Sequence, residues 1–228
     1  MRKDKLVVVI DGPAGSGKST VGKLLAQRLG YHYLDTGALY RAVAYVIGRD
    51  GIDEDEKEIG AYLQDLDIEL EKSTSGMRVR VNGEDVTERL RTEEVALRAS
   101  RISALRVVRE KLLPVQRAAG GTGGIVAEGR DMATVVFPRA EIKIFLDAAE
   151  EERVKRRHAE LAARDPGMDY EKVAAGLQRR DRQDRTRAVA PLQPDPAAIH
   201  IDTTRMTAVE VVETVAAVIN RHLSREFA

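Results

Sequence analysis

The residues of this chain best suited to chemistry are Gly12–Thr20, which read Gly-Pro-Ala-Gly-Ser-Gly-Lys-Ser-Thr and match the pattern G-x-x-x-x-G-K-[ST]. Glycines allow consecutive backbone N–H groups to point into one hollow, and a helix that follows adds its positive N-terminal end. We expect Lys18 to reach the β- and γ-phosphates of a polyphosphate and the Ser19 hydroxyl to bind Mg²⁺. The alternative, a glycine-rich turn without a ligand, is disfavoured by the apolar run Leu6–Ile10 that leads directly into the loop.

Three arginines share one face of the helix that the sequence predicts over residues 150–164. Arg153, Arg156 and Arg157 stand at positions i, i+3 and i+4, which brings their guanidinium groups to the same side. One interpretation is a solvated basic face that pairs with the acidic residues of the same helix. The other is a lid that closes over a bound nucleotide and places cations beside the phosphoryl group in transfer. The phosphate-binding loop favours the lid.

A second charged segment, Gly129-Arg130-Asp131, comes just after the wholly apolar run Ile125–Ala127. Charged residues directly after a buried strand are hard to explain by packing alone. One alternative is an internal pair between Arg130 and Asp131 that holds the loop. The other is recognition of a base, because a carboxylate can accept the N4 amino group of cytosine while a guanidinium donates to the ring acceptors.

The segment Arg179–Arg187 alternates arginines with Asp181 and Asp184. These carboxylates argue against a nucleic-acid surface, since they would repel phosphate. In a continuous helix, Arg180, Asp184 and Arg187 fall at i, i+4 and i+7 on one face. That face is either a surface ion-pair ladder or a polar wall that recognises a sugar and a base.

Five short strand patterns separated by helical patterns predict the elements that must position these groups. The order predicts a doubly wound α/β fold around a five-stranded parallel sheet, in which ligands bind at the carboxyl ends of the strands. The segments are Leu6–Ile10, Tyr31–Asp35, Ile125–Ala127, Ile142–Leu146 and Ile199–Ile201.

An insertion interrupts this order. Met77, Val79 and Val81 alternate with polar residues up to Asn82-Gly83, which is a strong signal for a β-hairpin. We expect a single domain over residues 1–228 that contains a small antiparallel insertion at roughly 62–103 and a helical lid at 150–167.

Composition narrows the function further. The chain has 228 residues, of which 37 are basic and 37 acidic, so its formal charge is zero and it has no overall attraction to nucleic acid or anionic lipid. It has no cysteine, which excludes disulfides and thiolate catalysis. Because no apolar segment is long enough for a membrane span or a signal peptide, we expect a cytoplasmic protein without a membrane partner. The absence of heptads predicts a monomer.

Taken together and in order, several motifs make the chain resemble bacterial cytidylate kinases from end to end. They are Ile10-Asp11-Gly12-Pro13 with the phosphate loop, Leu34-Asp35-Thr36-Gly37-Ala38-Leu39-Tyr40-Arg41, Arg91-Thr92-Glu93-Glu94-Val95, Gly129-Arg130-Asp131-Met132 with Thr134-Val135-Val136-Phe137-Pro138, and Arg185-Thr186-Arg187-Ala188-Val189-Ala190-Pro191-Leu192. The resemblance implies transfer of the ATP γ-phosphoryl group to CMP or dCMP, with Mg²⁺, on a nucleoside monophosphate kinase fold. Its insertion would be the domain that binds the monophosphate.

The resemblance also implies roles for individual residues. The phosphates of ATP would be held by Gly12, Pro13, Ala14, Gly15, Ser16, Gly17, Lys18, Ser19 and Thr20, with Ser19 on the metal. Cytosine would be contacted by Thr36, Arg109, Asp131 and Arg187, the sugar by Ser100, Arg180 and Asp184, and the acceptor phosphate by Arg41 and Arg130. Lys18, Arg153 and Arg157 would be catalytic, with Arg156 as a further lid arginine.

Two positions depart from the family pattern. Thr36 stands where a serine is often found, which keeps the hydroxyl, and Glu128 stands where some members carry aspartate. Glu128 is thus only a candidate for a water-mediated Mg²⁺ contact. The nearest alternative function is a kinase of the same fold acting on another small acceptor, such as UMP. A nucleotide-binding switch without phosphoryl transfer is disfavoured, because a guanine-reading Asn-Lys-x-Asp motif is missing.

Overall fold

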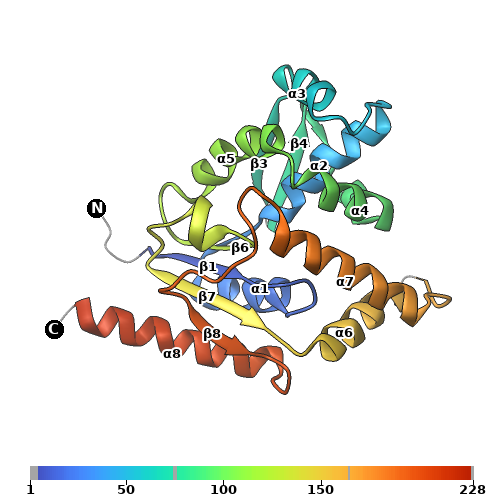
Figure 1. The fold of residues 1–228 in the computed structure, drawn as a ribbon. Helices are drawn as coiled ribbons and strands as arrows, with labels where there is room; N and C mark the ends of the chain where they lie inside the picture. Colours follow the sequence, from blue (N-terminus) through green and yellow to red (C-terminus); the bar gives the residue numbers. More distant parts are fainter. Residues whose placement is uncertain (1–4, 74–75, 164, 227–228) are drawn as a thin grey trace.

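A five-stranded parallel sheet forms the centre of the protein (Figure 1). The computed structural model describes residues 5–73, 76–163 and 165–226. The strands lie in the order β2-β6-β1-β7-β8. Their bounds are β1 Val7–Asp11, β2 His32–Asp35, β6 Ile125–Gly129, β7 Ile142–Asp147 and β8 Ile199–Asp202. Each strand overlaps one of the segments expected from the sequence, so the predicted parallel sheet is confirmed.

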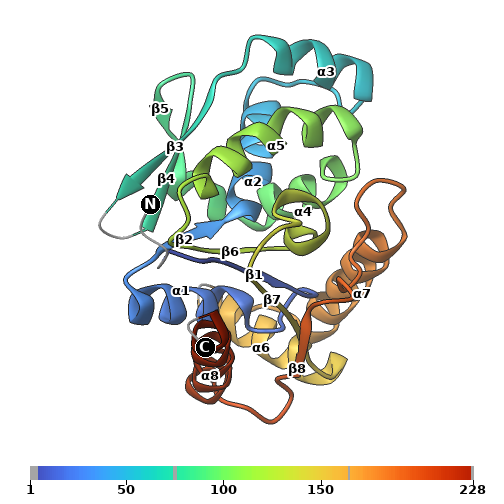
Figure 2. The ribbon, with the colours of Figure 1, turned by 90° about the vertical axis from the view of Figure 1, so that its left-hand side faces the viewer.

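Helices cover both faces of this sheet. On one face, α1 (Lys18–Leu29) and α8 (Ala208–Glu226) enclose an apolar core with Val8, Ile10 and Ile144. On the other, Val9 and Leu34 pack with residues from α5 (Arg106–Gly120) and from the π-helical turn Met132–Val136. Figure 2 shows α5 on the side of the sheet opposite α1 and α8. The fold is therefore doubly wound, as the sequence predicts.

The inserted region has an apolar core of its own. It contains the antiparallel sheet β3 (Ile68–Ser73), β4 (Gly76–Val81) and β5 (Glu84–Asp85). The predicted hairpin turn is confirmed, since Asn82 and Gly83 both have positive φ, 49° and 80°. Around it lie the helices α2 (Thr36–Arg49), α3 (Glu56–Gln64) and α4 (Glu93–Ile102), together with the 3-10 turn Thr87–Arg91. The core extends beyond residues 62–103, because α2 and α5 also contribute to it.

The arginine-rich segment forms two packed helices beside the carboxyl end of the sheet, α6 (Glu150–Ala162) and α7 (Tyr170–Thr186) (Figure 1). Residue 164, the last of the predicted helix 150–164, lies outside the described residues. Within the described part of the chain, none of the helices has the length and apolar character needed to cross a membrane.

Candidate active site

The phosphate loop connects β1 to α1 through glycines in conformations that other residues avoid. Gly12, Gly15 and Gly17 have φ of 149°, 76° and 92°. A Cβ on Gly12 would lie 2.0 Å from the carbonyl oxygen of Leu146, and one on Gly15 would lie 2.7 Å from that of Arg153. The backbone of the phosphate loop is therefore packed closely against both β7 and α6.

We expect the substitution Gly12→Ala to destabilise the protein strongly. The new Cβ would collide with the main chain of β7, which is paired on both sides by β1 and β8 and cannot move aside, so the cost should reach several kcal/mol, against about 1–2 kcal/mol for left-handed backbone alone. Denaturant unfolding measures this loss. The matched control is Gly30→Ala, because Gly30 has φ of 64° but no heavy atom of the described residues within 4 Å of its added Cβ. Equal losses in both variants would contradict the steric explanation.

Lys18 begins α1 and is buried. Its ammonium donates to the Pro13 carbonyl oxygen at 2.6 Å and to Ser16 Oγ at 3.4 Å. Burial, together with the positive charge of Arg130, lowers the pKa of Lys18 to about 7. An added anion would stabilise the charged ammonium, so this end of the site is suited to phosphate.

A single pocket of about 380 Å³ extends from the phosphate loop between α2, α4, the turn after β6, α6 and α7. All of the residues that the sequence assigned to the acceptor nucleotide line it, namely Thr36, Arg41, Ser100, Arg109, Arg130, Asp131, Arg180, Asp184 and Arg187. Ala14, Gly15, Lys18, Ser19 and Arg157 line it from the donor side. The other assigned residues, Gly12, Pro13, Ser16, Gly17, Thr20 and Arg153, lie outside its lining.

Asp131 lines the same pocket as the phosphate loop, and it is 3% exposed. Arg109 donates a hydrogen bond to its carboxylate, and Arg187 Nη2 lies 3.9 Å from Asp131 Oδ1. Thr36 Oγ1 donates to the Glu128 carbonyl oxygen at 2.7 Å. Around Asp131, the pocket therefore offers a carboxylate between two guanidinium groups. This arrangement is expected for binding a heterocyclic ring that has donors and acceptors on one edge.

Asp11 holds the turn that carries Asp131. Its carboxylate accepts the backbone N–H of Met132 at 2.9 Å and that of Ala133 at 2.8 Å. Burial raises the pKa of Asp11 to about 6. The last residue of β1 thus joins the phosphate loop to the turn that follows Asp131.

The pocket lining is rich in cations. Arg130 Nε lies 2.8 Å from Asp184 Oδ2, so the pair between Arg130 and Asp131 that the sequence left open does not form. Arg41 pairs with Asp35 at 2.6 Å. Burial, and then the charge of Arg130, lowers the pKa of Arg180 to about 10. Its buried Nε has no hydrogen-bond partner among the described residues. These guanidinium groups favour an anion between them.

The three arginines of α6 have different partners, although the sequence placed them on one face. Arg157 lines the pocket and contacts Glu93 at 3.1 Å and Glu160 at 2.9 Å. Arg156 pairs with Glu152 of the same helix at 2.8 Å, as the first of the two interpretations expects, and it also donates to Thr203, to the carbonyl oxygen at 2.7 Å and to Oγ1 at 3.0 Å.

Arg153 is buried next to the phosphate loop. It donates to the carbonyl oxygen of Ala14 at 3.1 Å and to that of Ala148 at 3.0 Å, and it pairs with Asp181. Of the three, only Arg157 reaches the pocket wall, while Arg153 joins α6 to the loop.

Several residues of the pocket were not assigned from the sequence, including Lys23, Tyr33, Asp35, Tyr40 and Ser103. Asp35 carried a signal, since it is a charged residue at the carboxyl end of a predicted strand. Sequence reasoning had little basis for placing Tyr40 in the pocket. The Tyr40 ring contacts Arg109 of a distant helix, whose guanidinium lies 5.5 Å from the ring centre.

Glu128 lies beside this group at the end of β6 and lines the pocket. It accepts a hydrogen bond from the Tyr33 hydroxyl. Burial, and then the charge of Asp35, raises the pKa of the Glu128 carboxyl.

Comparison with known proteins agrees with this geometry. The family model for cytidylate kinase matches residues 8–221. The chain is 45% identical to a cytidylate kinase of Geobacter sp. (strain M21), over 99% of this chain and 97% of that protein. It is 46% identical to a cytidylate kinase of Geobacillus kaustophilus (strain HTA426), over 97% of this chain and 99% of that protein. Similarity to a solved shikimate kinase from Acinetobacter baumannii in complex with shikimate is too weak to add to this, at 16% identity and a TM-score of 0.46 over 98% of this chain and 96% of that one. The chain belongs to the cytidylate kinase family.

Proposed function

We propose that this protein transfers the γ-phosphoryl group of ATP to CMP or dCMP, giving ADP and CDP or dCDP, in pyrimidine nucleotide metabolism. The observation that carries the proposal is one pocket that is lined both by Lys18 of the phosphate loop and by the Asp131 carboxylate. In this proposal two nucleotides bind there with their phosphates facing each other. The sequence relationship to cytidylate kinases supports the same reaction.

On the donor side, the backbone of Gly12–Thr20 and the Lys18 ammonium would hold the phosphates of ATP. Mg²⁺ fits the oxygen groups nearby, because the Ser19 hydroxyl shares the pocket wall with the Asp35 and Glu128 carboxylates. Burial raises the pKa of Glu128, and a cation near it would stabilise the charged carboxylate, which supports the proposal. When bound with ATP, Mg²⁺ would neutralise phosphate charge, with Ser19 as its protein ligand and Glu128 as a candidate for a contact through water.

On the acceptor side, Asp131 would accept the N4 amino group of cytosine. Arg109, Arg187 and Thr36 would surround the rest of the ring. Ser100, Arg180 and Asp184 would contact the sugar, and Arg41 and Arg130 the phosphate. The Arg41 guanidinium is already oriented by Asp35, 2.6 Å away.

The reaction requires no nucleophile from the protein. An oxygen of the acceptor phosphate attacks the γ-phosphorus in line, the bond from that phosphorus to the β–γ bridging oxygen breaks, and ADP leaves. The protein contributes alignment and positive charge. We propose that Lys18, Arg157 and Arg153 supply the positive charge. Arg157 would act from the pocket wall, and Arg153 from beside the phosphate loop, where it donates to the Ala14 carbonyl oxygen.

The same proposal assigns parts of the single domain. Residues 62–103 would bind the monophosphate and 150–167 would close as the lid, which would exclude water that could otherwise accept the phosphoryl group. The protein would act as a cytoplasmic monomer, with ATP and CMP or dCMP as its partners. Its balanced charge supports the absence of a nucleic-acid partner.

The test is product formation with ATP, Mg²⁺ and one acceptor at a time. We expect CDP from CMP and dCDP from dCMP, each with an equal amount of ADP, and much slower turnover of UMP and AMP. Preferential formation of UDP would support the alternative acceptor. ADP release without any nucleoside diphosphate would contradict the kinase proposal.

A further inference from the structure

Thr203, the first residue after β8, is bonded to the backbone of the phosphate loop. Its hydroxyl donates to the Ser16 carbonyl oxygen at 3.1 Å, although the two residues are 187 positions apart in the sequence. Its own N–H donates to the Asp147 carbonyl oxygen at the end of β7, at 2.8 Å. Thr203 is 2% exposed and lies outside the pocket lining, so any effect it has on a bound nucleotide passes through its neighbours.

Arg156 of α6 fixes the direction of this hydroxyl. Its Nη1 donates to Thr203 Oγ1 at 3.0 Å and its Nη2 donates to the Thr203 carbonyl oxygen at 2.7 Å, while its Nε donates to Glu152 at 2.8 Å. A guanidinium group can only donate, so the Thr203 hydroxyl accepts from Arg156 and turns its proton toward the Ser16 carbonyl oxygen. Arg156 is thus connected to the phosphate loop through Thr203.

The contact with Ser16 also orients a group on the other side of the same peptide. The peptide between Ser16 and Gly17 is planar and trans, so the Gly17 N–H points away from the Ser16 carbonyl oxygen and hence away from Thr203. In loops of this pattern, backbone N–H groups hold phosphate oxygens. Glycine allows this peptide to rotate more freely than other residues would, so a bond that holds its carbonyl oxygen also keeps its N–H in place.

α6 holds a second peptide of the loop. Arg153 donates to the Ala14 carbonyl oxygen at 3.1 Å, which directs the Gly15 N–H in the same manner. Arg156 lies close to the loop as well, since a Cβ on Gly17 would be 3.8 Å from its Nη1. Two arginines of α6 therefore hold two carbonyl oxygens of the loop, Arg153 directly and Arg156 through Thr203.

We propose that Thr203, oriented by Arg156, is a positioning residue that keeps the Gly17 N–H directed at the phosphates of the donor nucleotide. The inference depends on the proposed function, in which this loop binds ATP. It gives Arg156 a role other than that of a lid arginine, because Arg156 acts on the phosphates without touching them. Loss of the Thr203 hydroxyl should weaken the binding of the donor phosphates and leave the acceptor site unchanged.

The test is Thr203→Val, which keeps the shape of the side chain and removes the hydroxyl. We expect KM for ATP at saturating CMP to rise about threefold to tenfold, the effect of one buried hydrogen bond, while KM for CMP at saturating ATP stays the same. Inorganic tripolyphosphate has no nucleoside, so its Ki as a competitor of ATP reports on the phosphates alone. This Ki should rise by a factor similar to that for KM of ATP.

Two control variants separate positioning from a general structural effect. Thr203→Ser keeps the hydroxyl and should retain the wild-type KM for ATP. Thr214→Val also removes a hydroxyl that donates to a carbonyl oxygen, that of Glu210 at 2.8 Å, but on the exposed side of α8 and away from the pocket. It should leave both KM values and the Ki unchanged.

Arg156→Met tests the same connection from α6 and does not depend on whether Thr203→Val folds. It should raise KM for ATP and the Ki of tripolyphosphate, because the hydroxyl loses the donor that orients it. In a Thr203→Val background, Arg156→Met should have no further effect on the Ki, since the group through which it acts is gone. An arginine that contacted the phosphates directly would raise the Ki equally in both backgrounds.

An unchanged KM for ATP in both Thr203→Val and Arg156→Met would overturn the inference. So would an unchanged Ki of tripolyphosphate, an equal rise in KM for CMP, or an equal effect of Arg156→Met in the two backgrounds. In each of these cases the wild type would still form CDP, so the proposed function would stand. Failure of the wild type to form CDP would instead remove the proposed function itself.

Discussion

Replacing Lys18 by alanine is expected to lower kcat for phosphoryl transfer by about 10²- to 10³-fold, as the loss of one preorganised charge in an active site does. Lys18 is buried beside the phosphate loop and lines the pocket, and burial lowers its pKa to about 7, so a bound phosphate would stabilise its charged form. Initial rates of CDP formation at saturating ATP and CMP measure the effect.

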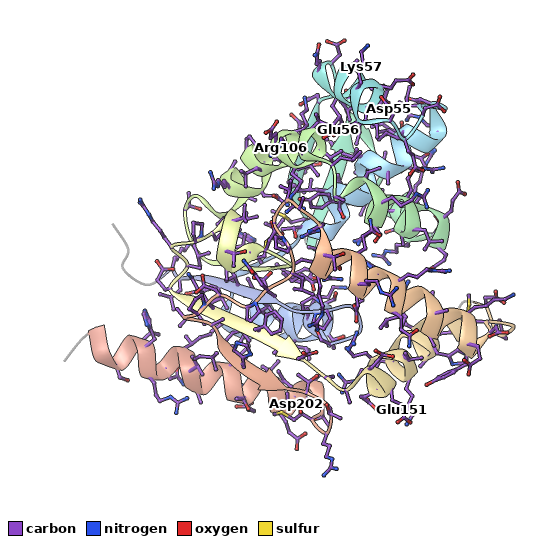
Figure 3. The ribbon with its side chains drawn as sticks, viewed as in Figure 1. Asp55, Glu56, Lys57, Arg106, Glu151 and Asp202 are labelled. Atoms are coloured by element: carbon purple, nitrogen blue, oxygen red, sulfur yellow. The ribbon has the colours of Figure 1, made fainter. Side chains whose placement is uncertain are left out.

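The control is Lys57→Ala. Lys57 is exposed on α3, at the end of the molecule distant from α1 (Figure 3), and should keep wild-type turnover. Thermal unfolding of both variants shows whether the fold is intact. A folded Lys18→Ala protein with near-wild-type turnover would contradict the assignment of this loop as the donor site.

The Asp131→Ala variant is expected to lose about tenfold to hundredfold in kcat/KM with CMP and clearly less with UMP. The carboxylate can accept the N4 amino group of cytosine, whereas uracil presents a carbonyl oxygen at that position and gains nothing from it. Measuring kcat/KM for both nucleotides in the same preparation gives the ratio that decides the question. Equal losses with CMP and UMP would remove the base-reading role from Asp131.

A companion variant is needed because Asp131 also has a structural role. Its removal leaves Arg109 and Arg187 buried without their carboxylate, which costs about 3–5 kcal/mol of stability when one partner of a buried pair is lost. Asp131→Asn keeps the shape and one acceptor oxygen. We expect it to be more stable than Asp131→Ala and to shift the preference from CMP toward UMP, because its amide can donate to the uracil carbonyl.

The fold was largely predictable because its signals are local. The strands β1 and β6 each contain a wholly apolar run, and Asn82-Gly83 determines its turn through its own backbone preferences. The gathering of the pocket residues follows from topology, since the carboxyl ends of parallel strands meet at one edge of a sheet. That is why Lys18, after β1, and Asp131, after β6, line the same pocket.

Contacts between charged groups and residues on other elements could not be predicted from local sequence signals. Helical spacing places Arg153, Arg156 and Arg157 on one face but does not say that Arg156 contacts Thr203 while Arg157 faces the pocket. Those partners lie on other elements, and their distances depend on how α6 packs against the sheet.

The same limit applies to contacts between distant segments. Arg130 pairs with Asp184 of α7 and not with its neighbour Asp131, and Asp11 caps the turn that follows Asp131. Hydrogen bonds between Gln183 and Ser100 join two helices that the sequence alone does not bring together. Each is decided by tertiary packing, on which periodicity gives no information.

The most direct test of the account is a crystal structure of the protein with CMP and a non-hydrolysable ATP analogue bound together. The account predicts that the cytosine amino group contacts Asp131, that the CMP phosphate lies beside Arg41 and Arg130, and that its oxygen lies in line with the γ-phosphorus at about 3–3.5 Å. A structure in which the two nucleotides occupy separate surfaces, or in which cytosine lies away from Asp131, would contradict it.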